Sequence, residues 1–451
     1  MRLSLFNILG LLTLLWFSVL QAQILDAGIY PPPVGGTYDY NTFKPGAAGF
    51  PALGGTYVDP VFGSTIRRIT NIGAKVGDDD SYSHNWSNAN GTYLFYTGDA
   101  MPALSILNTT TGALAYSGQP FGTSRYEINW HPTDPNKYFY LSGSNLMERN
   151  LTTQTSATLR TFPGALQLMG GSLNWVDRTG DLFVVMYGGT AKVWKRSTNS
   201  LYTGSVTPLN GGGWVSITPD GNYLVTAAGP SAPPNIEHHS YQINHATTSI
   251  GGTPTQFWGL CGDHGVLVSA TNGKNYFITF DCNDKPGLYR VDITLNQAGK
   301  TYAQQQAANQ KLVTLSFGPP TNTNDGHLTS VQVCPNANWV FFDSESFSTD
   351  GFNGSTSNWV AYKSEIMVMN VLTLEVRRLA HHRSRGINAP SVGYYTQPRI
   401  SVSGDGSVVS WASNMNISSP VGYADIYGIN NPLGPIVSIP KSKAPTNLRI
   451  L

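Results

Sequence analysis

One unit recurs seven times along the chain: an apolar strand, a polar turn that contains Gly or Asn, and a second apolar or aromatic strand. Successive turns, at positions 91, 136, 180, 221, 273, 337 and 406, lie 41 to 69 residues apart. A period of about 40–45 residues is typical of the four-stranded blade of a β-propeller. Seven small sheets packed around an axis bury both of their faces, which one such sheet cannot do alone. We therefore predict an all-β, seven-bladed β-propeller, with an array of β-sandwiches as the alternative.

Each unit consists of a first strand with its turn and then a second strand. The seven units are His84–Gly91 with Tyr93–Tyr96, Asn129–Asn136 with Tyr138–Leu141, Leu173–Gly180 with Leu182–Val185, Trp214–Gly221 with Tyr223–Val225, Val266–Gly273 with Tyr276–Ile278, Val331–Ala337 with Trp339–Phe342, and Ile400–Gly406 with Val408–Trp411.

Composition agrees with this architecture and excludes several classes of protein. The chain of 451 residues contains 48 Gly and 28 Pro, scattered without a short period, which indicates many turns and excludes collagen. Charged residues make up 12%, against about 25% on average, which argues against a charge-rich disordered chain. The formal net charge of +1 gives no electrostatic reason to expect nucleic acid or an anionic membrane as a partner.

The first residues are typical of an export signal. Arg2 is followed by the apolar run Ile8–Leu20, and Ala22 provides a small residue for cleavage. We expect a signal peptide over 1–22, an extension over 23–60, the propeller over 61–431 and a tail or linker over 432–451. The mature protein is then a monomer, secreted or periplasmic and free of the membrane; a membrane anchor is the alternative.

Ring closure and the cysteines give two further expectations. Ile66–Ile69 is expected to complete the last sheet beside Asp425–Tyr427. Cys261 and Cys282 lie almost opposite each other across a hairpin that turns at Asn272-Gly273, so they can form a disulfide; two reduced, buried thiols are the alternative. Cys334 lies in an apolar strand pattern and is expected to be buried and inert.

The turn Thr218–Gly221, with the sequence Thr-Pro-Asp-Gly, resembles the repeats of secreted TolB-type, WD40-like propellers over roughly residues 60–430. This resemblance supports the fold and leaves the function open.

Residues just before the innermost strands converge at one mouth of a propeller channel. These positions carry the candidate site residues His84, Arg125, Tyr126, Trp214, His264, His327, Tyr395, Gln397 and Arg399. One interpretation is a pocket that binds a divalent metal through His264 and His327, with Gln397 as an oxygen ligand. The other is that the histidines satisfy backbone groups at the strand starts.

A second resemblance concerns the last blades. Ile366–Tyr427 is similar to oligogalacturonate lyases, through Arg377–His382 and Gln397–Gly406. The resemblance implies β-elimination on acidic oligosaccharides and a manganese-type ion held by histidines and a glutamine; calcium is the other ion we consider. The chain departs from the family, because Tyr395-Thr396-Gln397 replaces a His-x-His pair.

Uronate elimination needs a cation that neutralises the carboxylate and a base that takes the neighbouring proton. Candidate cations are Arg125, Arg399 or the metal, and candidate bases are His84, Tyr126 and His239. We interpret His238-His239 and His381–Arg385 as surface loops. Aromatic residues that could bind sugar are Trp214 and Tyr395, whereas Trp86, Trp130 and Trp175 are expected in the core.

Two functions follow from these observations. The first is a carbohydrate-active protein, most concretely a polysaccharide lyase acting on acidic, uronate-containing polysaccharide or oligosaccharide. The alternative is a non-catalytic propeller that binds protein or glycan at the cell surface.

Overall fold

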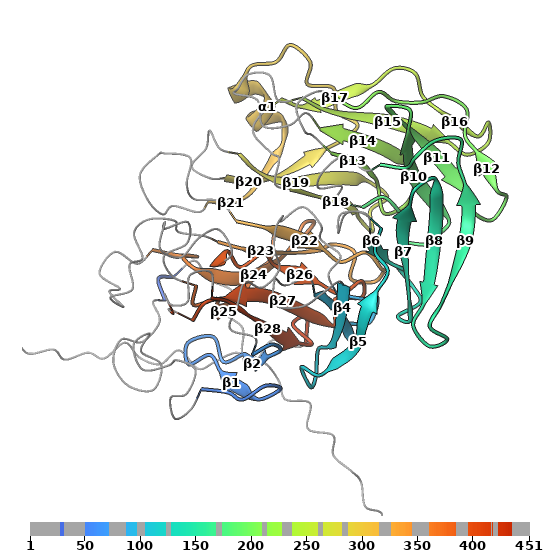
Figure 1. Ribbon diagram of the computed structural model, residues 1–451. Helices are drawn as coiled ribbons and strands as arrows, with labels where there is room; N and C mark the ends of the chain where they lie inside the picture. The colour runs from blue at the N-terminus through green and yellow to red at the C-terminus, as the bar shows by residue number, and fades with distance from the viewer. Residues whose placement is uncertain are drawn as a thin grey trace, which may run out of the picture.

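The chain folds into seven small antiparallel sheets that form a seven-bladed β-propeller, as predicted (Figure 1). The structure is a computed structural model. It describes residues 28–30, 50–71, 87–96, 104–122, 128–167, 174–209, 214–227, 237–259, 265–281, 287–314, 326–344, 360–384, 396–415, 417 and 423–434. Blades are numbered here from one to seven in chain order.

The strands of the first three blades are β3 (Tyr93–Tyr96), β4 (Leu104–Asn108) and β5 (Leu114–Gln119) in blade one, β6 (Ile128–Trp130), β7 (Lys137–Ser142), β8 (Asn145–Asn150) and β9 (Thr155–Thr161) in blade two, and β10 (Leu182–Tyr187), β11 (Thr190–Lys195) and β12 (Ser200–Leu201) in blade three. Blade four contains β13 (Val215–Ile217), β14 (Tyr223–Ala227), β15 (His238–Asn244), β16 (Ser249–Ile250) and β17 (Thr255–Trp258). Blade five contains β18 (Gly265–Ser269), β19 (Asn275–Asp281), β20 (Gly287–Asp292), the helix α1 (Tyr302–Ala308) and β21 (Gln310–Thr314).

Blade six contains β22 (Leu328–Ser330), β23 (Trp339–Asp343), β24 (Glu365–Asn370) and β25 (Val376–His381), and blade seven contains β26 (Ser401–Val402), β27 (Val408–Ser413), β28 (Asp425–Asn430), β2 (Thr65–Arg68) and β1 (Thr56–Val58).

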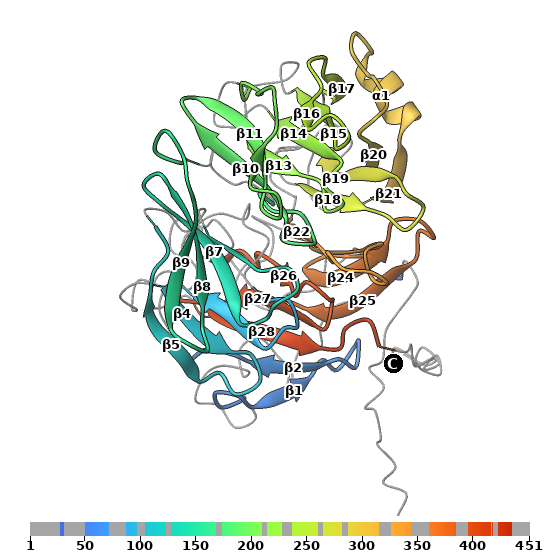
Figure 2. The same cartoon turned by 90° about the vertical axis from the view of Figure 1, so that its right-hand side faces the viewer.

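The ring is closed by a strand from the N-terminal side, which confirms the expectation for this segment. β2 pairs with β28, with Arg68 opposite Tyr427, and the two strands lie side by side in both views (Figures 1 and 2). The guanidinium of Arg68 also contacts the buried carboxylate of Asp425, with Nη2 2.8 Å from Oδ2. The hydroxyl of Thr70 donates to the other oxygen of Asp425 at 2.8 Å. Residues from the two ends of the propeller therefore share one sheet and one buried ion pair.

The inner hairpin turns also link neighbouring blades, as the turn of blade four illustrates. Gly221 has a φ of +75°, a conformation that favours glycine, and an added Cβ would lie 2.5 Å from Leu182 of blade three. On the other side, the carboxylate of Asp220 accepts a hydrogen bond of 2.8 Å from the side chain of Asn275 in blade five. The Pro-Asp-Gly sequence therefore shapes the turn and joins three blades.

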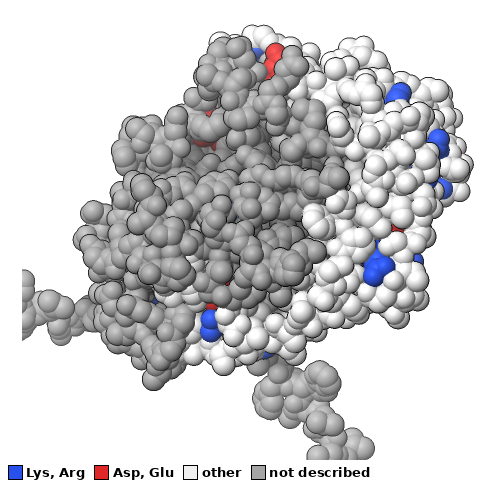
Figure 3. All heavy atoms as spheres, in the orientation of Figure 1, with Lys and Arg blue, Asp and Glu red and all other residues white. Residues whose placement is uncertain are grey.

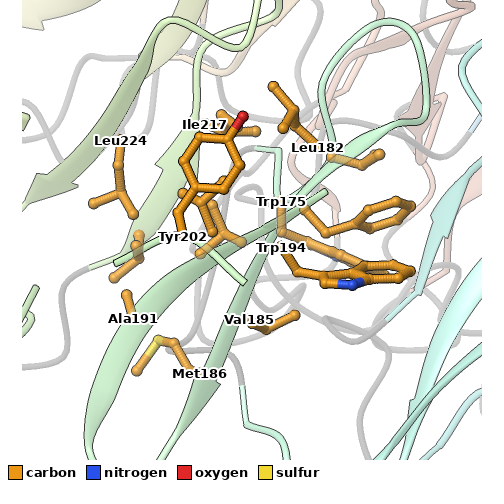
Figure 4. Close-up of a cluster of buried hydrophobic side chains, with 14 of the residues drawn as sticks. Trp175, Leu182, Val185, Met186, Ala191, Trp194, Tyr202, Ile217 and Leu224 are labelled. Atoms are coloured by element: carbon orange, nitrogen blue, oxygen red, sulfur yellow. The ribbon is translucent and has the colours of Figure 1, made fainter. Parts of the chain in front are cut away.

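The blades pack through aromatic and branched side chains from both neighbours. The largest such cluster surrounds blade three and includes Trp175, Trp194 and Tyr202 (Figure 4). Trp130 and Trp175 are 3% and 1% exposed, which confirms that they belong to the core. Fully burying a side chain of this size contributes about 2–3 kcal/mol or more, so these tryptophans stabilise the contacts between blades.

The remaining features of the fold concern blade five, the cysteines and the membrane. The insertion after blade five's third strand contains α1, which begins with a capping box at Thr301. Cys334 is exposed, so the expectation of a buried thiol is wrong, because this residue follows the end of β22 in a turn at the surface. Cys261 and Cys282 lie outside the described residues. Within the described ranges, no helix has the length and apolar character needed to span a membrane.

Candidate functional site

Strand ends of blades six and seven meet at one mouth of the propeller. The antiparallel register places the starts of β22 and β24 beside the ends of β23 and β25. β22 contacts β26, the innermost strand of the next blade. His327, Asp343, His381 and Arg399 lie at or next to these strand ends. Residues far apart in sequence therefore gather on one face, as the repeat pattern predicts.

Asp343 connects the two blades at this face. Its Oδ1 accepts a hydrogen bond of 3.0 Å from the backbone N–H of His327, and its Oδ2 accepts one of 3.2 Å from the backbone N–H of Ile400. Its own N–H donates to the carbonyl of His327 at 3.1 Å. The carboxylate is fully buried, so these donors replace the water that it would otherwise bind. The repeat pattern does not single out Asp343, whose local signal is an acidic residue directly after the apolar run Trp339–Phe342.

His327 lies directly before β22, with its imidazole buried against Asp343. Nδ1 is 3.8 Å from Oδ1 of Asp343, and the side chain is 1% exposed. Gly326 allows the approach, because a Cβ at this position would lie 2.0 Å from the carbonyl oxygen of Asp343. Gly326 is therefore a local requirement of this strand start, because it allows the close backbone contact within blade six.

Gln397 and Arg399 occupy the corresponding place before β26. Gln397 is 4% exposed, and Arg399 is partly exposed with a φ of +46°. The left-handed backbone of Arg399 is uncommon for a residue with a side chain. It directly precedes Ile400, whose N–H is bound by Asp343. This contact holds the turn that carries both predicted site residues.

The segment at the end of β25 differs from the expectation of a solvated loop. His381, His382 and Arg383 are each at most 1% exposed, so that interpretation is wrong for these three residues. Nδ1 of His382 accepts from the N–H of Ser384 at 3.0 Å, and Nε2 is 3.0 Å from the carbonyl oxygen of Ser344. These contacts fit a neutral imidazole with its proton on Nε2.

Residues of the N-terminal region cover this segment, which explains its burial. Nδ1 of His381 lies 3.4 Å from Oδ2 of Asp59, and Nε2 lies 2.8 Å from the carbonyl oxygen of Tyr30. Burial alone would raise the pKa of Asp59. The charges of His381 and Arg383, together with hydrogen bonds from His381 and from the N–H of Phe62, lower this pKa to about 2. Asp59 is therefore ionised throughout the neutral range.

A second buried ion pair supports the same region. Nε and Nη2 of Arg378 contact the two carboxylate oxygens of Glu365 at 2.6 and 2.5 Å, and both side chains are fully buried. Nη1 of Arg378 donates to the carbonyl of Gly28 at 2.6 Å. The guanidinium also lies over the ring of Tyr30, 4.8 Å from its centroid. Arg378 thus fastens the segment 28–30 to blade six.

Blade four contributes Trp214 and His239 from the corresponding strand ends. Trp214 is 3% exposed, and its ring lies 5.6 Å from that of Phe277 in blade five. His238 and His239 begin β15 rather than forming a surface loop, so that interpretation was wrong; His238 is fully buried. Nε2 of His239 is 3.1 Å from Oε2 of Glu237. Burial lowers the pKa of His239 and Glu237 opposes this effect, which leaves a largely neutral imidazole at pH 7.

Five predicted site residues fall outside the described ranges: His84, Arg125, Tyr126, His264 and Tyr395. Their roles stay predictions.

The described residues at this mouth do not form a full set of metal ligands. His327 and Gln397 begin adjacent innermost strands, but both oxygens of Asp343, the carboxylate beside them, already accept backbone hydrogen bonds. No group of three or more His, Cys, Asp or Glu side chains suited to a metal occurs in the described part of the chain. The described residues therefore do not complete a ligand set, and we assign no chemical step to a metal.

Comparison with solved structures supports the fold. The chain matches oligogalacturonate lyase from Vibrio parahaemolyticus with a TM-score of 0.51 and 12% identity, over 83% of this chain and 96% of that one. It also matches hydrazine synthase from Kuenenia stuttgartiensis (TM-score 0.38, 12% identity, 79% and 98% coverage) and U3-55K (TM-score 0.46, 10% identity, 81% and 98% coverage). No family model and no curated protein matches the sequence. At these identities the likeness concerns the fold alone.

Proposed function

We propose that this protein is a secreted, carbohydrate-active β-propeller that cleaves acidic, uronate-containing glycans by β-elimination. The observation that carries the proposal is the position of Arg399. Arg399 precedes β26 on a turn that Asp343 joins to the blade carrying His327, and we propose that its guanidinium serves the channel mouth. The architecture shared with an oligogalacturonate lyase supports the same class of substrate.

The positive charge of Arg399 suits an acidic substrate. A guanidinium remains protonated at all relevant pH values and matches the geometry of a carboxylate. Arg399 is partly exposed at this face, and its charge there can offset the substrate carboxylate and the enolate-like charge that develops beside it. Figure 3 shows that most of the described surface in that view carries neither Lys, Arg, Asp nor Glu.

β-Elimination removes a proton from the sugar and breaks one carbon–oxygen bond. A base takes the proton from the carbon next to the uronate carboxylate, the bond from the neighbouring carbon to the glycosidic oxygen breaks, and a carbon–carbon double bond forms. The departing oxygen takes up a proton from the protonated base or from water, which gives a free hydroxyl on the leaving sugar. His84, Tyr126 and His239 are the proposed bases. His239 is held by a contact of 3.1 Å with Glu237, and its lowered pKa keeps it able to accept a proton at pH 7.

The test uses the purified full chain with polygalacturonate, ulvan and related uronates. Unsaturated products are followed by their ultraviolet absorbance. We expect product from at least one uronate, and a loss of about a hundredfold or more in kcat/KM in Arg399→Gln. Arg160→Gln is the matched control, because Arg160 lies on the outer strand β9 and donates to Asn199 at 2.8 and 2.9 Å.

Failure to form product from any uronate would reject the lyase and favour the non-catalytic binding module. Equal activity of Arg399→Gln and the unmodified protein would remove Arg399 from the proposal. The thermal midpoints of both variants show whether folding is intact.

A further inference from the structure

The opposite end of the channel contains a small polar cavity that the proposed lyase site does not use. Its lining comes from the inner turns of blades one, two, three, six and seven, and includes Ser87, Asn129, His131, Arg178 and Gln332. These residues follow or end the innermost strands, whereas His327 and Arg399 precede them. The cavity and the proposed active site therefore lie at different ends of the molecule.

Polar residues line this cavity, and one of them has a buried group without a protein partner. Asn129 lines the cavity and is 4% exposed. The hydroxyl of Ser87 is buried and has no partner within the described ranges. A buried polar group that lacks a hydrogen bond costs about 1–3 kcal/mol, so such groups normally bind water, an ion or a ligand.

The positively charged group at the cavity is Arg178. Its backbone N–H donates to the carbonyl of Pro219 in blade four at 2.8 Å. Its Nη1 lies 3.7 Å from Sγ of Cys334 in blade six, which is a weak contact across the channel. No described carboxylate pairs with this guanidinium, which therefore retains donors for another acceptor.

The other titratable side chains at the cavity are already engaged. Oδ1 of Asp177 accepts from the N–H groups of Asp181 and Leu182, and Oδ2 accepts from the hydroxyl of Thr179. Nδ1 of His131 lies 3.1 Å from the N–H of Asp134 and accepts from it. Burial lowers the pKa of His131, with Glu148 opposing, so its ring is largely neutral at pH 7. The guanidinium of Arg178 is then the charged group at the cavity that no described ion pair neutralises, which favours an anion over a cation.

The volume of the cavity limits the size of the ligand. The cavity has a volume of about 20 Å³, more than the roughly 10–15 Å³ that one water needs and far too little for a sugar ring. We propose that this end of the channel binds a single small anion, a halide or a carboxylate group, between the guanidinium of Arg178 and the amide of Asn129. This site is independent of the proposed lyase activity.

The test measures thermal unfolding of the full chain in sodium bromide and sodium formate. The sodium concentration and ionic strength are held constant with the bulky sulfonate buffer anion MES. We expect a saturable rise in Tm with bromide and formate, and none with MES. Arg178→Met should weaken the apparent affinity by about tenfold or more, and Asn129→Ala should weaken it less. Arg160→Met, on the outer strand β9, is the control and should bind like the unmodified protein.

A crystal grown in bromide gives a second readout that does not depend on stability. We expect an anomalous peak within hydrogen-bonding distance of Arg178. A peak elsewhere with none in this cavity, an equal Tm rise in MES, or full binding by Arg178→Met would overturn the proposal.

Discussion

The carboxylate of Asp343, at the end of β23, accepts a hydrogen bond of 3.2 Å from the backbone N–H of Ile400, at the start of the neighbouring blade. The same carboxylate accepts one of 3.0 Å from the N–H of His327. One buried side chain therefore sets the relative position of two innermost strands. It also sets the turns that carry Arg399 and His327, so the channel mouth is built from contacts between blades.

Replacing Asp343 by Asn should disturb both stability and the proposed site. An asparagine offers one acceptor and turns its NH2 group toward a backbone N–H. Leaving a buried donor unsatisfied costs about 1–3 kcal/mol. We expect a loss of that size in the free energy of unfolding, measured with urea. Glu375→Gln, which breaks a partly exposed pair with Arg377, should cost less than about 1 kcal/mol. Equal losses in the two variants would contradict this role of Asp343.

Removal of Arg378 should be far more damaging than removal of the whole ion pair. Arg378→Met leaves Glu365 buried without its cation, which typically costs about 3–5 kcal/mol. The double variant Arg378→Met with Glu365→Leu removes both charges and should recover most of this loss. Urea unfolding of the three proteins measures both effects. A double variant as unstable as the single one would show that Arg378 acts mainly through its contact with the segment 28–30.

The free energy of unfolding of Arg378→Met should also depend on pH. Burial raises the pKa of Glu365, while Arg378 lowers it. Without Arg378 the pKa rises further, and the folded state binds a proton that the unfolded state releases. The stability of Arg378→Met should therefore fall as pH rises from 5 to 8, whereas the double variant should not show this fall.

Asp59 should contribute stability that is lost in acid. Its pKa is about 2 in the folded protein, below the ordinary value of 3.8. Its contribution is therefore complete above about pH 4 and disappears as pH falls toward 2. The shift corresponds to about 2 kcal/mol. Urea unfolding at pH 5, 4 and 3 should show a steeper loss in the unmodified protein than in Asp59→Asn. Parallel curves would contradict the coupling of Asp59 to His381 and Arg383.

The radial architecture was predictable because every blade carries the same local pattern of strand, turn and strand. The pairing of Ile66–Ile69 with the last blade followed from the same repeat. The interior of the site was not predictable, because it depends on contacts between distant segments. His381 and His382 looked like a surface loop, since nothing local shows that residues 28–30 and 57–62 cover them. Asp343 ends an ordinary strand, and its role becomes evident once Ile400 is beside it.

The metal prediction for His264, His327 and Gln397 remains open to a direct test. Two imidazoles and an amide oxygen favour a transition metal over calcium, which prefers several oxygen ligands. If these residues bind an ion, Mn²⁺ should raise the Tm of the EDTA-dialysed protein more than Ca²⁺ does. His327→Ala should abolish the rise. His245→Ala is the control, because His245 is exposed and contacts Tyr202 and Asn222 instead. An unchanged Tm with every divalent ion would remove the metal from the proposal, and a rise that persists in His327→Ala would place it elsewhere.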